Sequence, residues 1–272
     1  MGSDLIDFIF TIFFRLSITT SYYAWRYSGS YYGYDAAGNM TRNNQQYYAY
    51  GADNRFSQAT SLGRVLGIYA YNGKGERTSK TVNGVKTLFV YDTQGRVIGE
   101  YGDSGQLLRE HVYGLAGRLS TVSNNQIYWH HNDHLGTPQA LTDINATTVW
   151  TMSQTPFGIA TVNEDPDGNG IKVSNNFRFP GQYYDAETGL NYNYHRYYDS
   201  KTGRYTQSDP IGLRGGLNTF AYVLSNPISF IDPVGLSGID AMMYGGISST
   251  QAQGLSAAQQ APTFNDMWTS FS

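Results

Sequence analysis

Residues 86–101 read KTLFVYDTQGRVIGEY, and this stretch indicates the fold. Apolar and polar side chains alternate on both sides of the turn sequence DTQG at residues 92–95, as expected for two antiparallel strands joined by a tight turn. A second turn sequence, GDSG at residues 102–105, leads into another alternating segment at residues 107–113. We therefore predict three consecutive antiparallel strands.

The same arrangement of a strand followed by a turn recurs along the chain. Turn sequences follow Tyr34, Tyr50, Tyr71 and Tyr91, which are about 20 residues apart. An Asp after the tyrosine can accept hydrogen bonds from the turn backbone, and a glycine three residues later can adopt positive φ. A period of this length is typical of supersecondary units that stack on their neighbours.

The composition supports a β-rich protein and excludes several functional classes. The 272 residues include 24 Tyr and 31 Gly, and aromatic residues make up 15% of the chain, which favours strands and turns over helices. A net charge of -3 leaves no basic surface for nucleic acid. The absence of Cys removes disulfides, thiolate metal sites and a Cys nucleophile. No phosphate loop, zinc helix or nucleophile elbow motif is present, so we predict no cofactor.

The first 30 residues form an atypical N-terminal segment. Residues 5–14 are strongly apolar, but Asp7 interrupts them and Arg15 follows them. This stretch is too short and too broken for a transmembrane span, and no basic residue precedes it as in a secretory signal. A buried strand and a sequence foreign to the remaining domain are the two alternatives.

The composition changes abruptly after Leu236. The pentapeptide Asp-Pro-x-Gly-Leu occurs at residues 209–213 and again at residues 232–236. Beyond it, residues 237–272 contain no Lys, Arg or His, and Asp240 and Asp266 are their only charged residues. This segment offers too little apolar core to fold alone. We therefore expect a short irregular or helical C-terminal tail without an enzymatic activity of its own.

Several motifs together resemble a known family. The tyrosine turns resemble the YD repeat of the Rhs family. The sequence WHHNDHLGTP at residues 129–138 resembles another signature of that family. The block at residues 178–213, with Asn226, Pro227 and the second pentapeptide, resembles the Rhs repeat-associated core of bacterial polymorphic toxins. The resemblance covers residues 31–236.

The resemblance implies an all-β fold, an antiparallel sheet of YD-type β-hairpin repeats that forms part of a hollow shell. Its expected regions are a YD-repeat sheet at residues 31–176, the repeat-associated core with a self-cleavage segment at residues 177–236, and a variable tail at residues 237–272. The number of repeats is too small to close a compartment. The resemblance also implies a bacterial protein that is secreted or associated with the cell surface. Expected partners are its own tail, the remaining Rhs repeats, an immunity protein and secretion machinery such as type VI.

The resemblance assigns the self-cleavage to Asp209 and Asp232, with Leu236–Ser237 as the bond that is cut. Two carboxyl groups brought together by the fold share a proton and titrate as a unit, which supplies an acid and a base. Ser208 stands where many relatives have an Arg, so no cation is expected at that position. The alternative is that each pentapeptide is a type I turn with Asp first and Gly fourth. Both interpretations can hold together.

Two clusters suggest metal sites and have simpler interpretations. His130, His131, Asp133 and His134 lie within five residues, but their spacing matches no zinc pattern, and we favour structural hydrogen bonds. Asp165, Asp167 and Asn169 are similar to the first half of a calcium loop. The twelfth position is an Asn instead of the bidentate Glu, so calcium binding would be weak and a solvated turn is favoured.

The leading functional hypothesis is a toxin-delivery scaffold that presents a variable C-terminal segment and releases it by aspartate-mediated self-cleavage. A non-cleaving β-repeat module that binds carbohydrate or another surface partner is one alternative, and an inactive truncated fragment is another. For the tail, the alternatives are a remnant of a toxin, a small membrane-active segment around residues 242–244, and a piece whose partner lies elsewhere.

Overall fold

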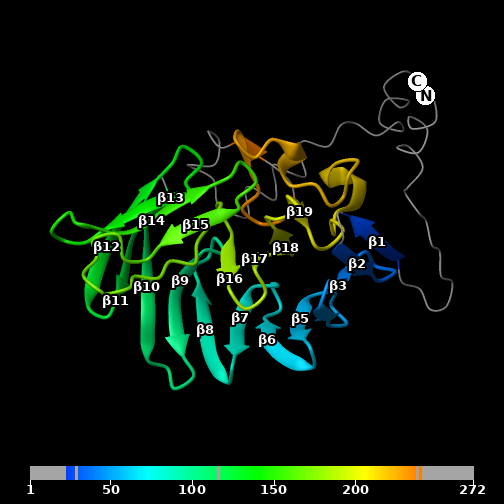
Figure 1. Cartoon of the computed structure of the whole chain (residues 1–272), viewed down its shortest axis with the longest axis horizontal. Coiled ribbons are helices and arrows are strands. Elements are labelled where there is room, and N and C mark those ends of the chain that lie inside the picture. The colour runs from blue at the N-terminus through cyan, green and yellow to red at the C-terminus, as the bar shows by residue number, and fades with distance from the viewer. Residues whose placement is uncertain (1–22, 28–29, 115–116, 237–238, 241–272) are drawn as a thin grey trace, which may run out of the picture.

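The tyrosine turns join consecutive strands of one long antiparallel sheet. The computed structural model describes residues 23–27, 30–114, 117–236 and 239–240. Fifteen strands of this sheet pair in chain order (Figure 1). They are β1 Tyr23–Tyr27, β2 Ser30–Tyr34, β3 Met40–Asn43, β4 Gln46–Tyr50, β5 Phe56–Ser61, β6 Arg64–Tyr71, β7 Arg77–Val82, β8 Val85–Tyr91, β9 Val97–Gly102, β10 Leu107–Gly114, β11 Gly117–Ser123, β12 Gln126–Asn132, β13 Pro138–Thr142, β14 Thr148–Gln154 and β15 Ala160–Asn163. The predicted all-β class is confirmed.

The turn chemistry is the one predicted from the sequence. Asp92 Oδ1 accepts hydrogen bonds from the backbone N–H groups of Gln94 and Arg96, both at 2.9 Å. Gly95 has φ 77°, a conformation that costs glycine little. Asp35 makes the equivalent pair of bonds in the first of these turns. The three strands expected across residues 86–113 are β8, β9 and β10, and their pairing is antiparallel.

The long sheet starts at Tyr23, within the segment that the sequence set apart as residues 1–30. β1 and β2 pair as a hairpin with Tyr23 opposite Tyr34. The apolar stretch at residues 5–14 lies outside the described residues. The described residues contain no helix long and apolar enough to cross a membrane.

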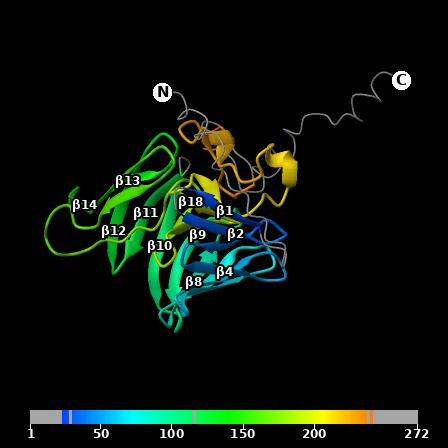
Figure 2. The same ribbon diagram turned by 45° about the vertical axis from the view of Figure 1, so that its right-hand side comes forward.

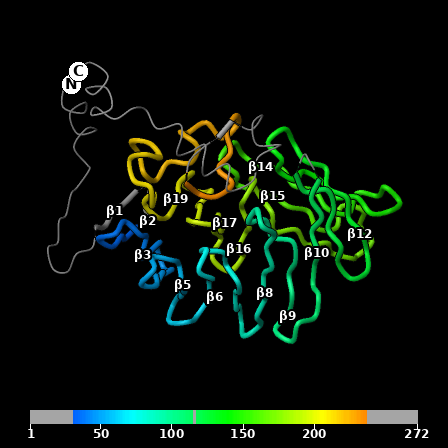
Figure 3. The backbone as a smooth tube through the Cα atoms, turned by 180° about the vertical axis from the view of Figure 1, so that it is seen from behind, coloured from blue at the N-terminus to red at the C-terminus, as the bar shows by residue number. Residues whose placement is uncertain are grey.

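A small four-stranded sheet packs against the inner face of the long one. Its strands are β16 Tyr183–Asp185, β17 Leu190–Asn193, β18 Arg196–Asp199 and β19 Arg204–Tyr205. Figures 1 and 3 show the long sheet curving around it. Aromatic rings from both sheets form the core between them, as in the edge-to-face pair of Phe56 and Tyr197 with ring centroids 4.5 Å apart. Such pairs add to the stabilisation from buried area.

Arg77 connects the two sheets through a buried ion pair. It comes from β7, its side chain is 1% exposed, and its guanidinium pairs with the carboxylate of Asp185 on β16. The rings of Tyr69, Phe89, Tyr183 and Tyr192 surround the same guanidinium. A buried charge is tolerated when it is paired and contacts aromatic faces. The register of the small sheet on the long one therefore depends on this contact.

The chain after β19 folds back over the small sheet. It contains two short 3₁₀ turns, η1 Gly212–Gly215 and η2 Val223–Ser225, and strand β20 Phe230–Ile231, which pairs with β21 Ile239–Asp240. Figure 2 shows this region beside β18. Tyr198, Tyr205 and Ile231 meet in a second buried cluster here. Of the tail expected at residues 237–272 to be irregular or helical, the structure describes residues 239–240, which form the strand β21 instead. The rest of the tail lies outside the described residues.

Candidate functional site

Asp209 and Asp232 meet at one guanidinium, although they are 23 residues apart in sequence. Arg196 Nη2 lies 3.1 Å from Asp209 Oδ2 and 3.4 Å from Asp232 Oδ2. Arg196 is the first residue of β18, Asp209 follows β19, and Asp232 follows β20. All three side chains are buried. The fold therefore brings together the two carboxyl groups that the resemblance singled out.

Arg196 is a part of this site that sequence reasoning missed. Its Nε donates to the carbonyl oxygen of Gly235 at 2.6 Å, and its Nη1 donates to that of Thr219 at 3.0 Å. The guanidinium also lies over the ring of Tyr205, 3.6 Å from the centroid. These contacts hold the guanidinium of Arg196 in place. Arg196 lies on β18, whereas its partners lie in later segments of the chain. The hydroxyl of Ser208, the residue before Asp209, donates a hydrogen bond to the Thr219 hydroxyl.

The second pentapeptide is buried and built around Asp232. Asp232 Oδ1 accepts a hydrogen bond from the backbone N–H of Leu236 at 3.0 Å, and Oδ2 accepts one from the Tyr205 hydroxyl at 2.7 Å. Gly235 has φ 71°, and a β-carbon there would overlap the carbonyl oxygen of Asn193. The turn therefore needs glycine for both its conformation and its close packing. As a result, Gly235 is held against β17 and β18 of the small sheet.

The first pentapeptide forms the turn that the sequence predicted. The N–H of Gly212 donates to the carbonyl oxygen of Asp209 at 2.9 Å, and Ile211 has φ -87° and ψ 1°, as in a type I turn. Asp209 Oδ1 also accepts from the N–H of Ile211 at 3.0 Å. Asp209 is thus the first residue of a type I turn, and its carboxyl group also faces the site.

The environment of Asp209 favours its protonated form. The pKa of this carboxyl is raised to about 6, mainly by burial; Arg196 and the N–H of Ile211 lower it in part, and the charge of Asp232 makes a smaller contribution that raises it. A carboxyl with a pKa near neutrality can hold a proton and release it during a reaction. Asp209 is therefore suited to act as an acid.

The carbonyl group of Leu236 lies beside the same carboxyl. A β-carbon built on Gly215 would overlap Asp209 Oδ2 and would lie 2.9 Å from the carbonyl oxygen of Leu236. Both oxygens thus border the same small space beside Gly215. This carbonyl belongs to the bond predicted to be cut. Ser237, on its other side, lies outside the described residues.

If the chain is cut after Leu236, as the resemblance implies, alanine at Gly215 is expected to slow the cut by about 100-fold, because a displacement of about 1 Å in reacting groups has that effect. Gly215 lacks a positive φ, so alanine fits its backbone and only the new methyl group disturbs the site. Cleavage rates of the refolded chain measure the effect. Gly73→Ala, in a turn with open space around it, is the matched control. An equal rate in both variants would contradict the proposed role of this space.

The histidine cluster forms hydrogen bonds and does not converge. Each member has its own partner. His130 bonds to the Thr121 hydroxyl, His131 to the Thr142 hydroxyl and His134 to the carbonyl oxygen of Ile228. The carboxylate of Asp133 accepts from the N–H groups of Leu135 and Thr137. These are hydrogen bonds of the structural kind that the sequence favoured. Over residues 30–114 and 117–236, no three His, Asp or Glu side chains group so as to hold a metal ion.

The loop with the calcium-like pattern bonds to itself. Asp167 Oδ2 accepts from the side chain of Asn169 at 2.7 Å, and Asp165 Oδ2 accepts from the N–H of Gly170 at 3.1 Å. Asp167 and Asn169 are exposed. These contacts are those of the solvated turn that the sequence favoured.

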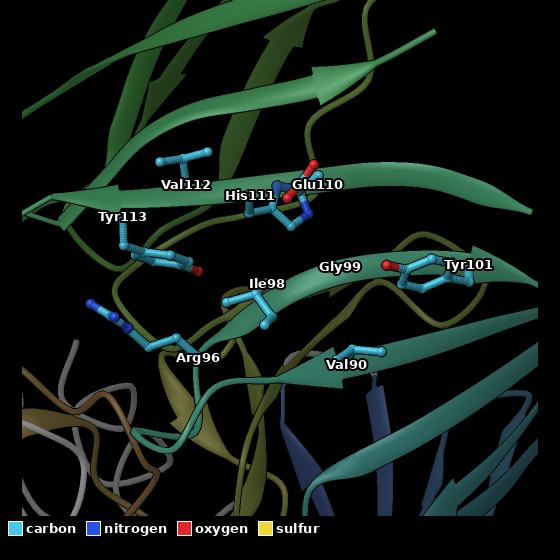
Figure 4. A pocket seen from close by; sticks show the side chains of 9 residues that line it. All are labelled: Val90, Arg96, Ile98, Gly99, Tyr101, Glu110, His111, Val112 and Tyr113. Atoms are coloured by element: carbon cyan, nitrogen blue, oxygen red, sulfur yellow. The ribbon is translucent and has the colours of Figure 1, made fainter. Parts of the chain in front are cut away.

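A cavity of about 350 Å³ lies elsewhere, on the long sheet. Its lining comes from β8–β10 and the turn before β9, and it includes Arg96, His111 and Tyr113 (Figure 4). His111 is buried, which lowers its pKa, and it bonds to Glu100 and Thr121. Every polar contact of this imidazole is therefore used within the sheet, and neither aspartate lines the cavity.

A family model described as Teneurin YD-shell matches residues 23–215. The chain belongs to the Teneurin YD-shell family. The resemblance to Rhs and YD-repeat proteins is thereby confirmed. The match includes Arg196 and Asp209 and ends before Asp232.

The YD-shell relatives are much longer proteins. The chain is 31% identical over 211 residues to the tRNA3(Ser)-specific nuclease WapA of Bacillus spizizenii, a match to 74% of the chain and 9% of that protein. It is 38% identical over 118 residues to the toxin protein Tse5 of Pseudomonas aeruginosa, covering 43% of the chain and 8% of Tse5. A crystal structure of TcdB2-TccC3 without its hypervariable C-terminal region has the same fold, with a TM-score of 0.59 and 20% identity over 75% of this chain and 11% of that one. The chain thus spans about a tenth of the length of these relatives.

Proposed function

We propose that this chain is the C-terminal part of a toxin scaffold that cuts itself between Leu236 and Ser237. The observation that carries the proposal is the meeting of Asp209, Asp232 and Arg196 beside the carbonyl group of Leu236. Relatives named as a nuclease and a toxin, and the hypervariable C-terminal region of TccC3, support a role in delivering a variable segment. The segment released would begin at Ser237.

The proposed chemistry is hydrolysis by a water molecule between two carboxyl groups. One group takes a proton from the water as its oxygen bonds to the carbonyl carbon of Leu236, and the other gives a proton to the carbonyl oxygen. The intermediate then breaks its bond to the nitrogen of Ser237, which receives a proton. The products are a carboxyl group on Leu236 and an amine on Ser237. Arg196 holds the two carboxyl groups close despite their mutual repulsion.

In this proposal the regions have separate tasks. Residues 31–176 contribute strands to a shell, residues 177–236 carry out the cut, and residues 237–272 are the tail that is released. The partners are the remaining repeats of a longer shell, an immunity protein, and secretion machinery such as a type VI system. The protein would act outside the bacterium that makes it or at its surface.

Cleavage of the refolded full-length chain, followed over pH by electrophoresis and mass spectrometry, tests this function. We expect fragments that end at Leu236 and begin at Ser237. Because Asp209 must carry a proton, the rate should fall about tenfold for each pH unit above about 6. A chain that stays intact at every pH would contradict the proposal and would favour a non-cleaving surface-binding module.

A further inference from the structure

We propose that Tyr205 is a positioning residue that keeps Asp232 ionised, so that Asp232 is the base and Asp209 the acid of the self-cleavage. This inference rests on the proposed function. It adds which of the two carboxyl groups holds the shared proton, and it names the residue that determines this. Tyr205 lies at the end of β19 and its side chain is almost fully buried.

The contacts around the Tyr205 hydroxyl determine where its proton points. Asn193 Nδ2 lies 2.8 Å from this hydroxyl oxygen and 2.9 Å from the backbone carbonyl oxygen of Asp232. The carbonyl oxygen can only accept, so the amide nitrogen of Asn193 faces both oxygens and donates to them. The hydroxyl therefore accepts from Asn193. Its single proton is left for Asp232 Oδ2, at 2.7 Å.

The two carboxyl groups consequently have different surroundings. Asp232 accepts from Tyr205, from the N–H of Leu236 and from Arg196. Three donors to one buried carboxyl favour its ionised form. Among the described residues Asp209 has two such donors, the N–H of Ile211 and Arg196, and its burial raises its pKa to about 6. A proton is therefore more favourable on Asp209 than on Asp232.

The other ionisable groups nearby preserve this difference. Arg196 contacts both carboxyl groups and so stabilises both anions. Burial, followed by the charge of Asp232, raises the pKa of Tyr205 well above its ordinary value. Burial also raises that of Tyr222, whose ring packs on Tyr205 with centroids 5.8 Å apart. Both phenols stay protonated around neutral pH, so Tyr205 remains a donor.

With this assignment, the steps of the reaction balance. Asp232 takes a proton from water as the water oxygen bonds to the carbonyl carbon of Leu236, and Asp209 gives its proton to the carbonyl oxygen. Asp209 then takes a hydroxyl proton back from the intermediate as the carbonyl group reforms. Asp232 gives its proton to the nitrogen of Ser237 as the C–N bond breaks. Both groups end in the forms in which they began.

The pH profile of cleavage in Tyr205→Phe tests the assignment. Loss of one hydrogen bond to a charged acceptor should move the acidic limb of the profile upward by about one to two pH units, because Asp232 must be ionised to act. The alkaline limb, set by Asp209, should stay in place. Tyr198→Phe is the matched control, since the Tyr198 hydroxyl is in the same aromatic cluster but donates to the carbonyl oxygen of Phe157.

A second measurement does not require cleavage. In an Asp209→Asn background, the carboxyl ¹³C signal of Asp232 should titrate at a higher pH when Tyr205→Phe is added, by the same one to two units. A rate that falls equally at all pH values, or an unmoved titration, would overturn the role of Tyr205. Failure of the parent chain to cleave, with the titration shifted as expected, would overturn the proposed function alone.

Discussion

Replacing Asp232 with asparagine is expected to reduce cleavage after Leu236 by about 10⁴-fold, as loss of an essential catalytic group does in other hydrolases. Asparagine has nearly the same shape and can still accept the hydrogen bond from the N–H of Leu236. It cannot take a proton from water. Electrophoresis of the refolded chain over several days would show only the intact band.

The matched control for this change is Asp103→Asn. Asp103 is exposed and forms an ion pair with Lys86, whose Nζ lies 3.3 Å from Asp103 Oδ1. The same loss of one negative charge there should leave the cleavage rate unchanged. Thermal unfolding of both variants separates a chemical defect from misfolding. Cleavage of Asp232→Asn at the parent rate would exclude Asp232 from the reaction.

Replacing Arg77 with methionine is expected to lower the free energy of unfolding by about 3–5 kcal/mol. Methionine can fill part of the space, but it leaves the buried carboxylate of Asp185 without its main partner. Lys80, 2.9 Å from the same carboxylate, would compensate only in part. Urea denaturation in the Asp232→Asn background measures the change on a chain that remains in one piece.

Lys86→Met is the matched control for Arg77→Met. It removes a cation from the exposed pair with Asp103 and should cost less than about 1 kcal/mol. If both variants lost equally little stability, the buried pair would not hold the sheets together. If Arg77→Met is destabilised as expected, cleavage should slow as well, because Asp185 and Arg196 belong to the same small sheet.

The long sheet was predictable because its determinants are local. Alternation with a period of two sets the faces of a strand, and an Asp with a glycine three residues later sets the turn. These signals gave β8, β9 and β10 within one or two residues. The type I turn at residues 209–212 was predictable for the same reason. The pairing of Asp209 with Asp232 came from the family resemblance, since spacing alone left it open.

The remaining parts of the site come from distant segments, and no local signal indicates them. Arg196 lies in the motif RYYD at residues 196–199, where nothing distinguishes it from a strand arginine. Gly215 borders the site because the fold places Asp209 and Leu236 next to it. The hydroxyl of Tyr205 has its role because Asn193 occupies its acceptor position.

The sequence by itself therefore determined the strand-and-turn architecture, because that depends on neighbours in the chain. The two candidate carboxyl groups came from the family resemblance, and the boundary after Leu236 stays a prediction. The tertiary structure decided which cation joins the carboxyl groups and which hydrogen-bond donors surround each of them. Those properties depend on burial and on hydrogen bonds between β17, β18, β19 and the final turn. They exist only when the small sheet has packed inside the long one.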